Sequence, residues 1–398
     1  MISTHPLTGF LDTPVRRDEG LAPAQLVPAR RLANCDKILF VTHLALGDFA
    51  YLQNFFQAFA TAHPHIRIHL WVDERRRTWR RARWEFLRNS ALYDWLESCP
   101  FIARTYRETY SPATLRKSIR DAQQEQFPLI VTFATLQSPW YISLSRKISP
   151  DAFIVGMRHP APFYALLRRL AYRRLDASLD FRSLVRPGRH ITNVYADCFR
   201  SLFGLDVPEA GRFPFVRIPA LWDRAADEQL AGWQFDPASR RGAQLVFVNP
   251  YAKIRKRCWP LSDVAALIGA LRLREEWSGA YFLVNVPPEE MEAAARSFAA
   301  GPRDRVRLFS AQENFFQLPA MLRRCDLIIS VETAVMHLAN AVHVPVIALM
   351  RQKNPEWAPI DQELSTLVLA PGRHDWVSAI SVAQVLAALP GKPVLQAV

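Results

Sequence analysis

The amino-acid sequence predicts an α/β protein with two doubly wound domains that face each other across a cleft. Short apolar runs alternate with amphipathic helical stretches along most of the chain. The alternation stops in a segment rich in Pro, Asp and Arg at 206–241 and then restarts. Half of the 398 residues are hydrophobic, which is enough for two or three domain cores. Apolar strands that alternate with helices are typical of parallel sheets covered on both faces.

The first domain is predicted at 36–205, after an N-terminal extension at 1–35 that is expected to be loosely ordered. Its first strand begins at Lys37, and further strands are predicted at 66–72, 101–106, 128–134 and 151–157. A helix is expected from Phe49, a long helical segment from the second strand to about Ser98, and helices after the third and fourth strands.

The second domain is predicted at 242–398, with 206–241 as the linker. Its strands are predicted at 244–250, 280–286, 305–310, 326–330, 345–350 and 366–370. Helices are expected from about 260, 288, 314 and 334, and at 376–389. Ligands of doubly wound sheets bind at the carboxyl ends of the strands, so the turns after the strands should carry the functional side chains.

The basic excess of the chain lies in its first half. Before residue 242 there are 34 Lys+Arg and 23 Asp+Glu, against 16 and 14 from there on. This predicts an anionic partner, either nucleic acid, a membrane surface or a phosphorylated substrate. No zinc-finger, RNP-like or helix-turn-helix pattern is present, which disfavours nucleic acid. Five widely spaced cysteines favour a reduced, cytoplasmic protein, and the N-terminus lacks a signal-peptide pattern.

One polar turn stands between two apolar strands at 330–350. Thr333 is predicted to cap the helix that follows, which leaves backbone N–H groups and a positive dipole end at the edge of the sheet. Such a helix end binds phosphate. Glu332 could accept hydrogen bonds from sugar or ribose hydroxyls, and His337 lies one helical turn later. The alternative is an ordinary capped helix with a histidine at the edge of the core.

A second turn, at 249–260, carries four cations. Lys253, Arg255, Lys256 and Arg257 precede a helix that begins near Pro260. Cations there could neutralise a diphosphate leaving group, whose charge grows in the transition state. The alternative is a solvated basic loop. The chain contains no D-x-D pair that would chelate a metal-bound diphosphate, so cations and a helix end are expected to take that role.

The third turn follows the first strand and contains Gly47 and Asp48. Gly47 would allow close approach of the backbone. Asp48 could serve as a general base in the cleft, because a carboxylate there could take the proton of an attacking hydroxyl. The alternative is that Asp48 only caps the next helix.

These three turns resemble segments of glycosyltransferase family 9, the bacterial lipopolysaccharide heptosyltransferases. The family has a Leu/Met-Gly-Asp loop, a K-x-W-P turn and a segment of the form D-T/S-G-x-x-H-L-A-A-A-x-x-x-P-x-x-A-L-F. The corresponding residues here are 46–48, 257–260 and 332–350. The resemblance covers roughly 36–390, and its last segment is the most specific.

The resemblance implies a GT-B architecture with two Rossmann-like domains, the acceptor on the first and a nucleotide-diphospho-sugar on the second. It implies transfer with inversion and no tightly bound metal or cofactor, with ADP-heptose the favoured donor. Asp48 corresponds to the catalytic base. The diphosphate-holding turn corresponds to Thr333, Ala334, Val335 and His337.

Two further roles follow from the resemblance. Arg257, or its neighbour Lys256, corresponds to the phosphate-contacting lysine, and Glu289 or Glu290 to the ribose ligand. The alternative for the glutamates is an acidic first helical turn. Three departures bear on the donor sugar: Glu332 replaces Asp, Ala334 replaces Gly, and Arg257 replaces Lys. Ala334 is tolerable only if its backbone stays in the right-handed helical region.

Two basic stretches in the first domain are interleaved with apolar residues. One carries seven arginines from Arg75 to Arg88, among them Arg76, Arg80 and Arg83, and the other covers 163–175 and includes Arg169 and Arg173. Such stretches suit an anionic membrane surface or a phosphorylated, lipid-linked glycan acceptor. The alternative is a solvated helix face that covers the core with arginine stems.

With the basic surface, the resemblance implies an inverting glycosyltransferase at the cytoplasmic face of the inner membrane of a Gram-negative bacterium, peripheral to it. The acceptor would be a lipopolysaccharide core or related anionic glycan. Two other functions stay open at this point. The chain could be a GT-B nucleotide-sugar-binding protein with degenerate catalysis, or a nucleotide-sugar epimerase. The oligomeric state is not predicted.

Overall fold

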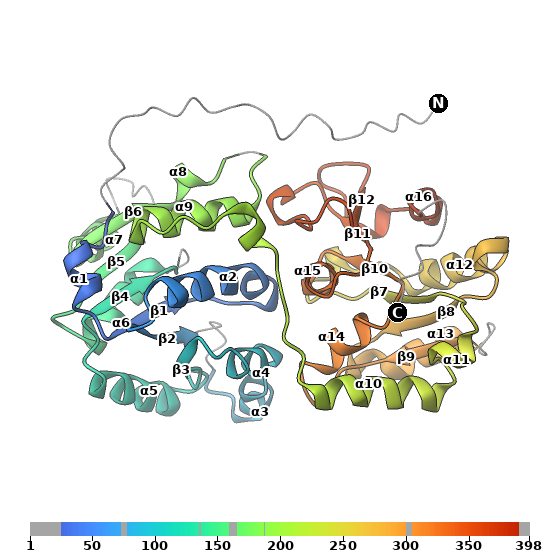
Figure 1. Ribbon diagram of the computed structural model, residues 1–398, viewed down its shortest axis with the longest axis horizontal. Coiled ribbons are helices and arrows are strands. Elements are labelled where there is room, and N and C mark those ends of the chain that lie inside the picture. The colour runs from blue at the N-terminus through green and yellow to red at the C-terminus, as the bar shows by residue number, and fades with distance from the viewer. Residues whose placement is uncertain are drawn as a thin grey trace.

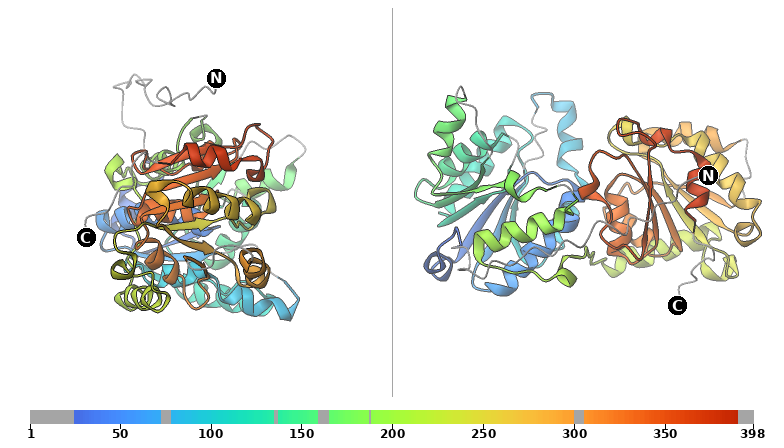
Figure 2. Two further views of the ribbon diagram at one scale, coloured as in Figure 1. Left: turned by 90° about the vertical axis from the view of Figure 1, so that its right-hand side faces the viewer. Right: turned by 90° about the horizontal axis from the view of Figure 1, so that it is seen from above.

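The structure, a computed structural model, describes residues 25–72, 78–134, 137–158, 165–186, 188–299 and 305–389. Within these residues it forms two parallel six-stranded sheets with helices packed around them (Figure 1). The two lobes lie side by side along the longest axis of the molecule, as Figure 2 also shows. The predicted α/β fold with two doubly wound, Rossmann-like domains of the GT-B type is confirmed.

The first sheet has the strand order β3-β2-β1-β4-β5-β6. Its strands are β1 Lys37–Thr42, β2 Arg67–Val72, β3 Ile102–Tyr106, β4 Leu129–Thr132, β5 Phe153–Arg158 and β6 Ala177–Asp180. The order reverses between β1 and β4, which places a topological switch point at the end of β1. β6 was not predicted from the sequence, because its four residues contain one buried apolar side chain, Leu179, and show no apolar run.

The helices of the first lobe are α1 Ala29–Ala33, α2 Leu46–Ala62, α3 Trp84–Arg88, α4 Ala91–Glu97, α5 Pro112–Gln124, α6 Ser138–Ile148, α7 Leu166–Tyr172, α8 Phe181–Leu184 and α9 Ile191–Phe203. The long helix expected up to Ser98 is instead divided into short helices. Asn89 and Ser90 leave the helical conformation between α3 and α4. Both residue types have a lower helix propensity than alanine or leucine, which favours a break there.

The second sheet repeats the topology of the first, in the order β12-β11-β10-β7-β8-β9. Its strands are β7 Leu245–Asn249, β8 Tyr281–Asn285, β9 Val306–Phe309, β10 Leu327–Val331, β11 Val346–Met350 and β12 Ser365–Leu369. All six were predicted. The central strands β7, β10 and β11 are buried along their whole length, as expected of a sheet covered on both faces.

The segment predicted as a linker connects the two sheets but contains regular structure. It includes α10 Ala220–Trp233 and α11 Pro237–Arg240. The other helices of the second lobe are α12 Leu261–Arg272, α13 Met291–Ala299, α14 Gln317–Leu322, α15 Ala334–Ala341 and α16 Val382–Ala387. Only Ala226 and Leu230 of α10 are buried, so its periodicity is weak in the sequence. It is held by Arg324, whose guanidinium donates to Asp227 at 2.8 Å.

The end of the predicted N-terminal extension packs against the first lobe. Val27 is fully buried, and its backbone N–H donates to the carbonyl of Leu202 at 3.0 Å. Leu32 of α1 is also buried. The expectation of a loosely ordered extension is therefore wrong from Val27 onward, because these apolar side chains join the core. Residues 1–24 lie outside the described residues.

Apolar and polar contacts join the two lobes directly. Trp95 of α4 stacks on Phe315 before α14, with ring centroids 4.7 Å apart and an interplanar angle of 14°. The backbone N–H of Phe315 donates to Asp94 Oδ2 at 2.8 Å. α2 and α15 also lie against each other (Figure 1). These contacts bring the carboxyl ends of the two sheets together.

Candidate active site

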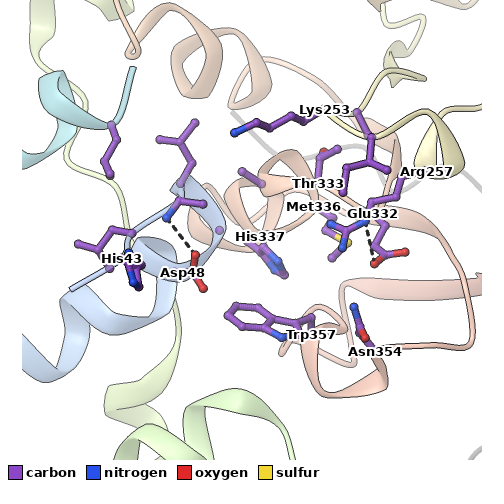
Figure 3. Close-up of a pocket in the computed structure, with 18 of the residues that line it drawn as sticks. His43, Asp48, Lys253, Arg257, Glu332, Thr333, Met336, His337, Asn354 and Trp357 are labelled. Carbon is purple, nitrogen blue, oxygen red and sulfur yellow. Dashed lines mark hydrogen bonds and ion pairs between the residues drawn. The ribbon is translucent and has the colours of Figure 1, made fainter. Parts of the chain in front are cut away.

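A cavity of about 620 Å³ lies between the two lobes. The first lobe lines it with the end of β1 and the start of α2, and the second with the loop after β7, the turn between β10 and α15, and the loop after β11 (Figure 3). The predicted residues that line it are Gly47, Asp48, Lys253, Arg257, Glu332, Thr333, Ala334 and His337. All three turns singled out in the sequence therefore meet at one place.

Asp48 stands in the first turn of α2, on the first-lobe wall of the cavity (Figure 3). Its Oδ2 accepts a hydrogen bond from the backbone N–H of Ala45 at 2.9 Å, so it takes part in capping the helix. Burial raises the pKa of Asp48, and the backbone hydrogen bonds and the nearby His43 imidazole oppose that rise only in part. A carboxylate with a raised pKa is a stronger base, so capping and proton abstraction are compatible roles.

The helix-capping prediction for Thr333 is confirmed. Thr333 Oγ1 accepts a hydrogen bond from the backbone N–H of Val335 at 3.3 Å. Asn249, the last residue of β7, donates to Thr333 Oγ1 and Ser330 Oγ, each at 3.0 Å, and so fixes the turn. The N-terminal end of α15 thus borders the cavity, and the positive end of its helix dipole favours an anion there.

The turn accepts Ala334 in place of glycine without strain. Ala334 is the first helical residue of α15 and is absent from the described residues with positive φ. The condition set by the sequence is therefore met. Val335 is buried and does not line the cavity, and its backbone N–H is hydrogen-bonded to Thr333.

Glu332 is almost fully buried and paired with two arginines. Its carboxylate accepts from Arg351 Nε at 3.0 Å and from Arg351 Nη2 at 3.1 Å. Arg257 Nε lies 3.3 Å from Glu332 Oε1, on the cavity side (Figure 3). Arg351 was not singled out in the sequence.

His337 makes a contact between the lobes. Its Nδ1 shares a 2.8 Å hydrogen bond with Tyr51 Oη of α2. Burial lowers the pKa of His337 to about 3, so the imidazole is neutral. A Cβ atom at Gly47 would lie 3.5 Å from His337 Cδ2, which is ordinary contact. Gly47 therefore stands where α2 approaches the second lobe, and space alone does not require a glycine there.

A family model of glycosyltransferase family 9 (heptosyltransferase) matches residues 170–375, more than half of the chain. The chain belongs to glycosyltransferase family 9. Among curated proteins, no sequence matches this family 9 chain.

Solved structures show the same fold at low sequence identity. The family 9 glycosyl transferase from Veillonella parvula is 19% identical with a TM-score of 0.65, covering 89% of this chain and 95% of that one. The ADP-heptose LPS heptosyltransferase II of E. coli is 15% identical with a TM-score of 0.64, covering 88% and 97%. E. coli heptosyltransferase WaaC with ADP is 17% identical with a TM-score of 0.57, covering 88% and 96%.

Three residues predicted for the site, Lys256, Glu289 and Glu290, do not line the cavity. Lys256 is exposed, with Nζ 5.8 Å from the ring centroid of Trp376. Glu289 and Glu290 form a short 3-10 turn after β8. The charge of Glu290 adds to burial in raising the pKa of Tyr251, so this turn lies near the loop after β7.

The predicted basic surface is partly described. The arginines at 80, 83, 169 and 173 are exposed, which agrees with both a partner surface and a solvated face. Leu166, Leu167 and Leu170 of α7, next to these arginines in the sequence, are also exposed. Arg76 lies outside the described residues. No helix among the described residues is long and apolar enough to cross a membrane.

Several residues of the site were not predicted from the sequence. Asn354 and Trp357, in the loop after β11, line the cavity, and so does His43 at the end of β1. All three follow the carboxyl ends of central strands, so the rule that places ligands there could have found them. Within the described part of the chain, no group of three or more His, Cys, Asp and Glu could hold a metal ion.

Proposed function

We propose that this family 9 protein transfers a sugar, with inversion and without a metal ion, from a nucleotide-diphospho-sugar to an anionic glycan. The observation that carries the proposal is the cavity itself. Asp48 lines it from one lobe, while Lys253, Arg257 and the capped start of α15 line it from the other. A base thus faces an anion-binding wall across a space large enough for a ligand.

The proposed step is a single displacement. Asp48 takes the proton of the acceptor hydroxyl. The oxygen of that hydroxyl attacks the anomeric carbon, and the bond from that carbon to the diphosphate oxygen breaks. The attacking and leaving oxygens stand on opposite faces of the carbon, so its configuration inverts. Lys253, Arg257 and the positive end of the α15 helix dipole stabilise the charge that develops on the diphosphate.

The donor that we propose to test first is ADP-heptose. The family description names heptosyltransferases, and the E. coli heptosyltransferase WaaC has been solved with ADP and with ADP-2-deoxy-2-fluoro heptose. Glu289 or Glu290 would bind the ribose, and Lys256 would add positive charge outside the cavity. The domain limits proposed for donor and acceptor binding are 242–398 and 36–205.

The acceptor that we propose is a lipopolysaccharide core or a related glycolipid, met at the cytoplasmic face of the inner membrane. Exposed arginines and leucines alternate on α7, so the helix offers both charge and apolar area to an anionic bilayer. Peripheral binding at this surface would bring the acceptor toward the first lobe.

A donor panel and one variant test the function. ADP-, UDP- and GDP-sugars are screened by thermal shift and for release of nucleoside diphosphate with a lipopolysaccharide-core acceptor. Asp48→Asn should keep donor binding but lose about 10²- to 10⁴-fold in turnover, the range of general-base catalysis. Asp151→Asn, an exposed carboxylate of the same lobe, is the control and should leave turnover unchanged.

Three outcomes would contradict the proposal. Full turnover by Asp48→Asn would remove the base from the mechanism. A wild-type protein stabilised by a donor that it never consumes would be a binding protein. An altered sugar in the absence of any acceptor would indicate an epimerase.

A further inference from the structure

We infer that Glu332 is a positioning residue, which Arg351 orients so that it holds the Arg257 guanidinium at the cavity wall for the donor diphosphate. This inference rests on the proposed function and deepens it. It assigns Glu332 a role different from direct contact with the hydroxyls of the donor sugar. It also adds Arg351, which does not belong to the described lining of the cavity.

Both carboxylate oxygens of Glu332 are already engaged by protein groups. Oε2 accepts from Arg351 Nε at 3.0 Å, and Oε1 accepts from Arg351 Nη2 at 3.1 Å, a two-point pairing that fixes the carboxylate plane. The backbone N–H of Arg351 adds a longer contact of 3.4 Å to Oε2. A carboxylate held in this way has little freedom to turn toward a sugar.

The two sides of the pairing differ in rigidity. Glu332 and Arg351 directly follow β10 and β11, which are neighbouring buried strands with Val331 opposite Leu349. Arg257, by contrast, ends a three-residue 3-10 turn in the loop after β7. The strand ends therefore form the fixed side of the cluster, and they hold an arginine side chain that comes from a loop.

Exposure increases from the fixed side toward the cavity. Glu332 is 4% exposed, the Arg351 side chain 11% and the Arg257 side chain 30%. Arg257 Nε is buried and makes no hydrogen bond within the described part of the chain, so the charge of Glu332 is what compensates its burial. Without that charge, the guanidinium would gain by turning away toward water.

The charges of the cluster suit a diphosphate. One carboxylate between two guanidinium groups leaves a net charge of one positive unit, and Lys253 adds another on the same wall of the cavity. Glutamate is one methylene longer than the aspartate of the family pattern, and here its carboxylate lies within 3.3 Å of both arginines.

Replacing Glu332 by Gln separates this role from plain electrostatics, because the two predict opposite changes in nucleotide affinity. If Glu332 were only a nearby negative charge, its removal would tighten binding of ADP, UDP or GDP. The positioning role predicts weaker binding by about tenfold, since a charge-assisted contact from Arg257 to phosphate is lost. The preference for ADP over adenosine should fall by the same factor. Glu363→Gln removes an exposed glutamate of the same lobe and serves as control.

Arg351→Lys provides a second test with the charge retained. Lysine cannot make the two-point contact, so ADP binding should weaken although residue 351 does not line the cavity. Unchanged or tighter nucleotide binding in a folded Glu332→Gln protein, or unchanged binding in Arg351→Lys, would overturn the inference. The wild-type protein is titrated first with the same three nucleotides. Failure of the wild type to bind any of them would count against the proposed function. A difference in affinity between the wild type and a variant bears only on the roles of Glu332 and Arg351.

Discussion

The hydrogen bond between Tyr51 and His337 offers a direct measure of how firmly the lobes are joined. Tyr51→Phe removes one hydroxyl group and keeps the ring, which packs edge-on against His337 with centroids 4.8 Å apart. The change leaves His337 Nδ1 without its 2.8 Å partner. Tyr51 Oη also has a longer contact, 3.4 Å, to the carbonyl of Ala358 in the second lobe.

The size of the effect follows from the surroundings of His337. The imidazole is 3% exposed, so water does not replace the lost partner. Its pKa is lowered to about 3, so it also does not gain a proton near neutral pH. An unpaired buried polar group costs about 1–3 kcal/mol. We therefore expect Tyr51→Phe to lower the free energy of unfolding by about 2 kcal/mol, roughly a 30-fold change in the folded-to-unfolded ratio.

Urea unfolding at pH 7 checks this value, with the midpoint shifted and the slope unchanged. Tyr106→Phe is the matched control. Tyr106 is also buried, in β3, but its hydroxyl has no hydrogen-bond partner among the described residues. Its removal should cost no more than about 0.5 kcal/mol. Equal losses in the two variants would refute the assignment of stability to the bond between the lobes.

Two further predictions concern pH and packing. His337 takes up a proton near pH 6.5 in the unfolded chain but only near 3 in the folded one, so its contribution to stability is complete above 6.5 and is lost as the pH falls toward 3. Between pH 7 and pH 5, the titration of His337 should lower the free energy of unfolding, measured with urea, by about 2 kcal/mol. Asparagine does not titrate, so an equal decrease in His337→Asn would argue against His337 as the cause. Trp95→Ala removes the buried ring that stacks on Phe315 and should cost about 3–5 kcal/mol, whereas Trp79→Ala, at an exposed site, should cost less than about 0.5 kcal/mol in the same assay. Similar losses for both tryptophans would contradict the packing argument.

The central strands of the second lobe, β7, β10 and β11, could be predicted because burial on both faces leaves a continuous apolar run in the sequence. The four residues of β6, at the edge of the first sheet, show no such run. For the same reason α10 was not predicted, since it buries only Ala226 and Leu230 and is held by ion pairs to Arg324. The periodicity of apolar residues in a sequence reflects burial, and elements held by polar contacts show little of this periodicity.

The sequence by itself determined the two doubly wound sheets and the turns that carry Asp48, Lys253 and Thr333. A residue that ends a buried strand or caps a helix is recognisable from its immediate neighbours. Only the tertiary structure decided what these residues meet. Tyr51 and His337 are 286 positions apart, and Arg351 reaches Glu332 from the next strand of the sheet. Such contacts depend on strand order and on how the lobes pack, which local sequence patterns do not encode.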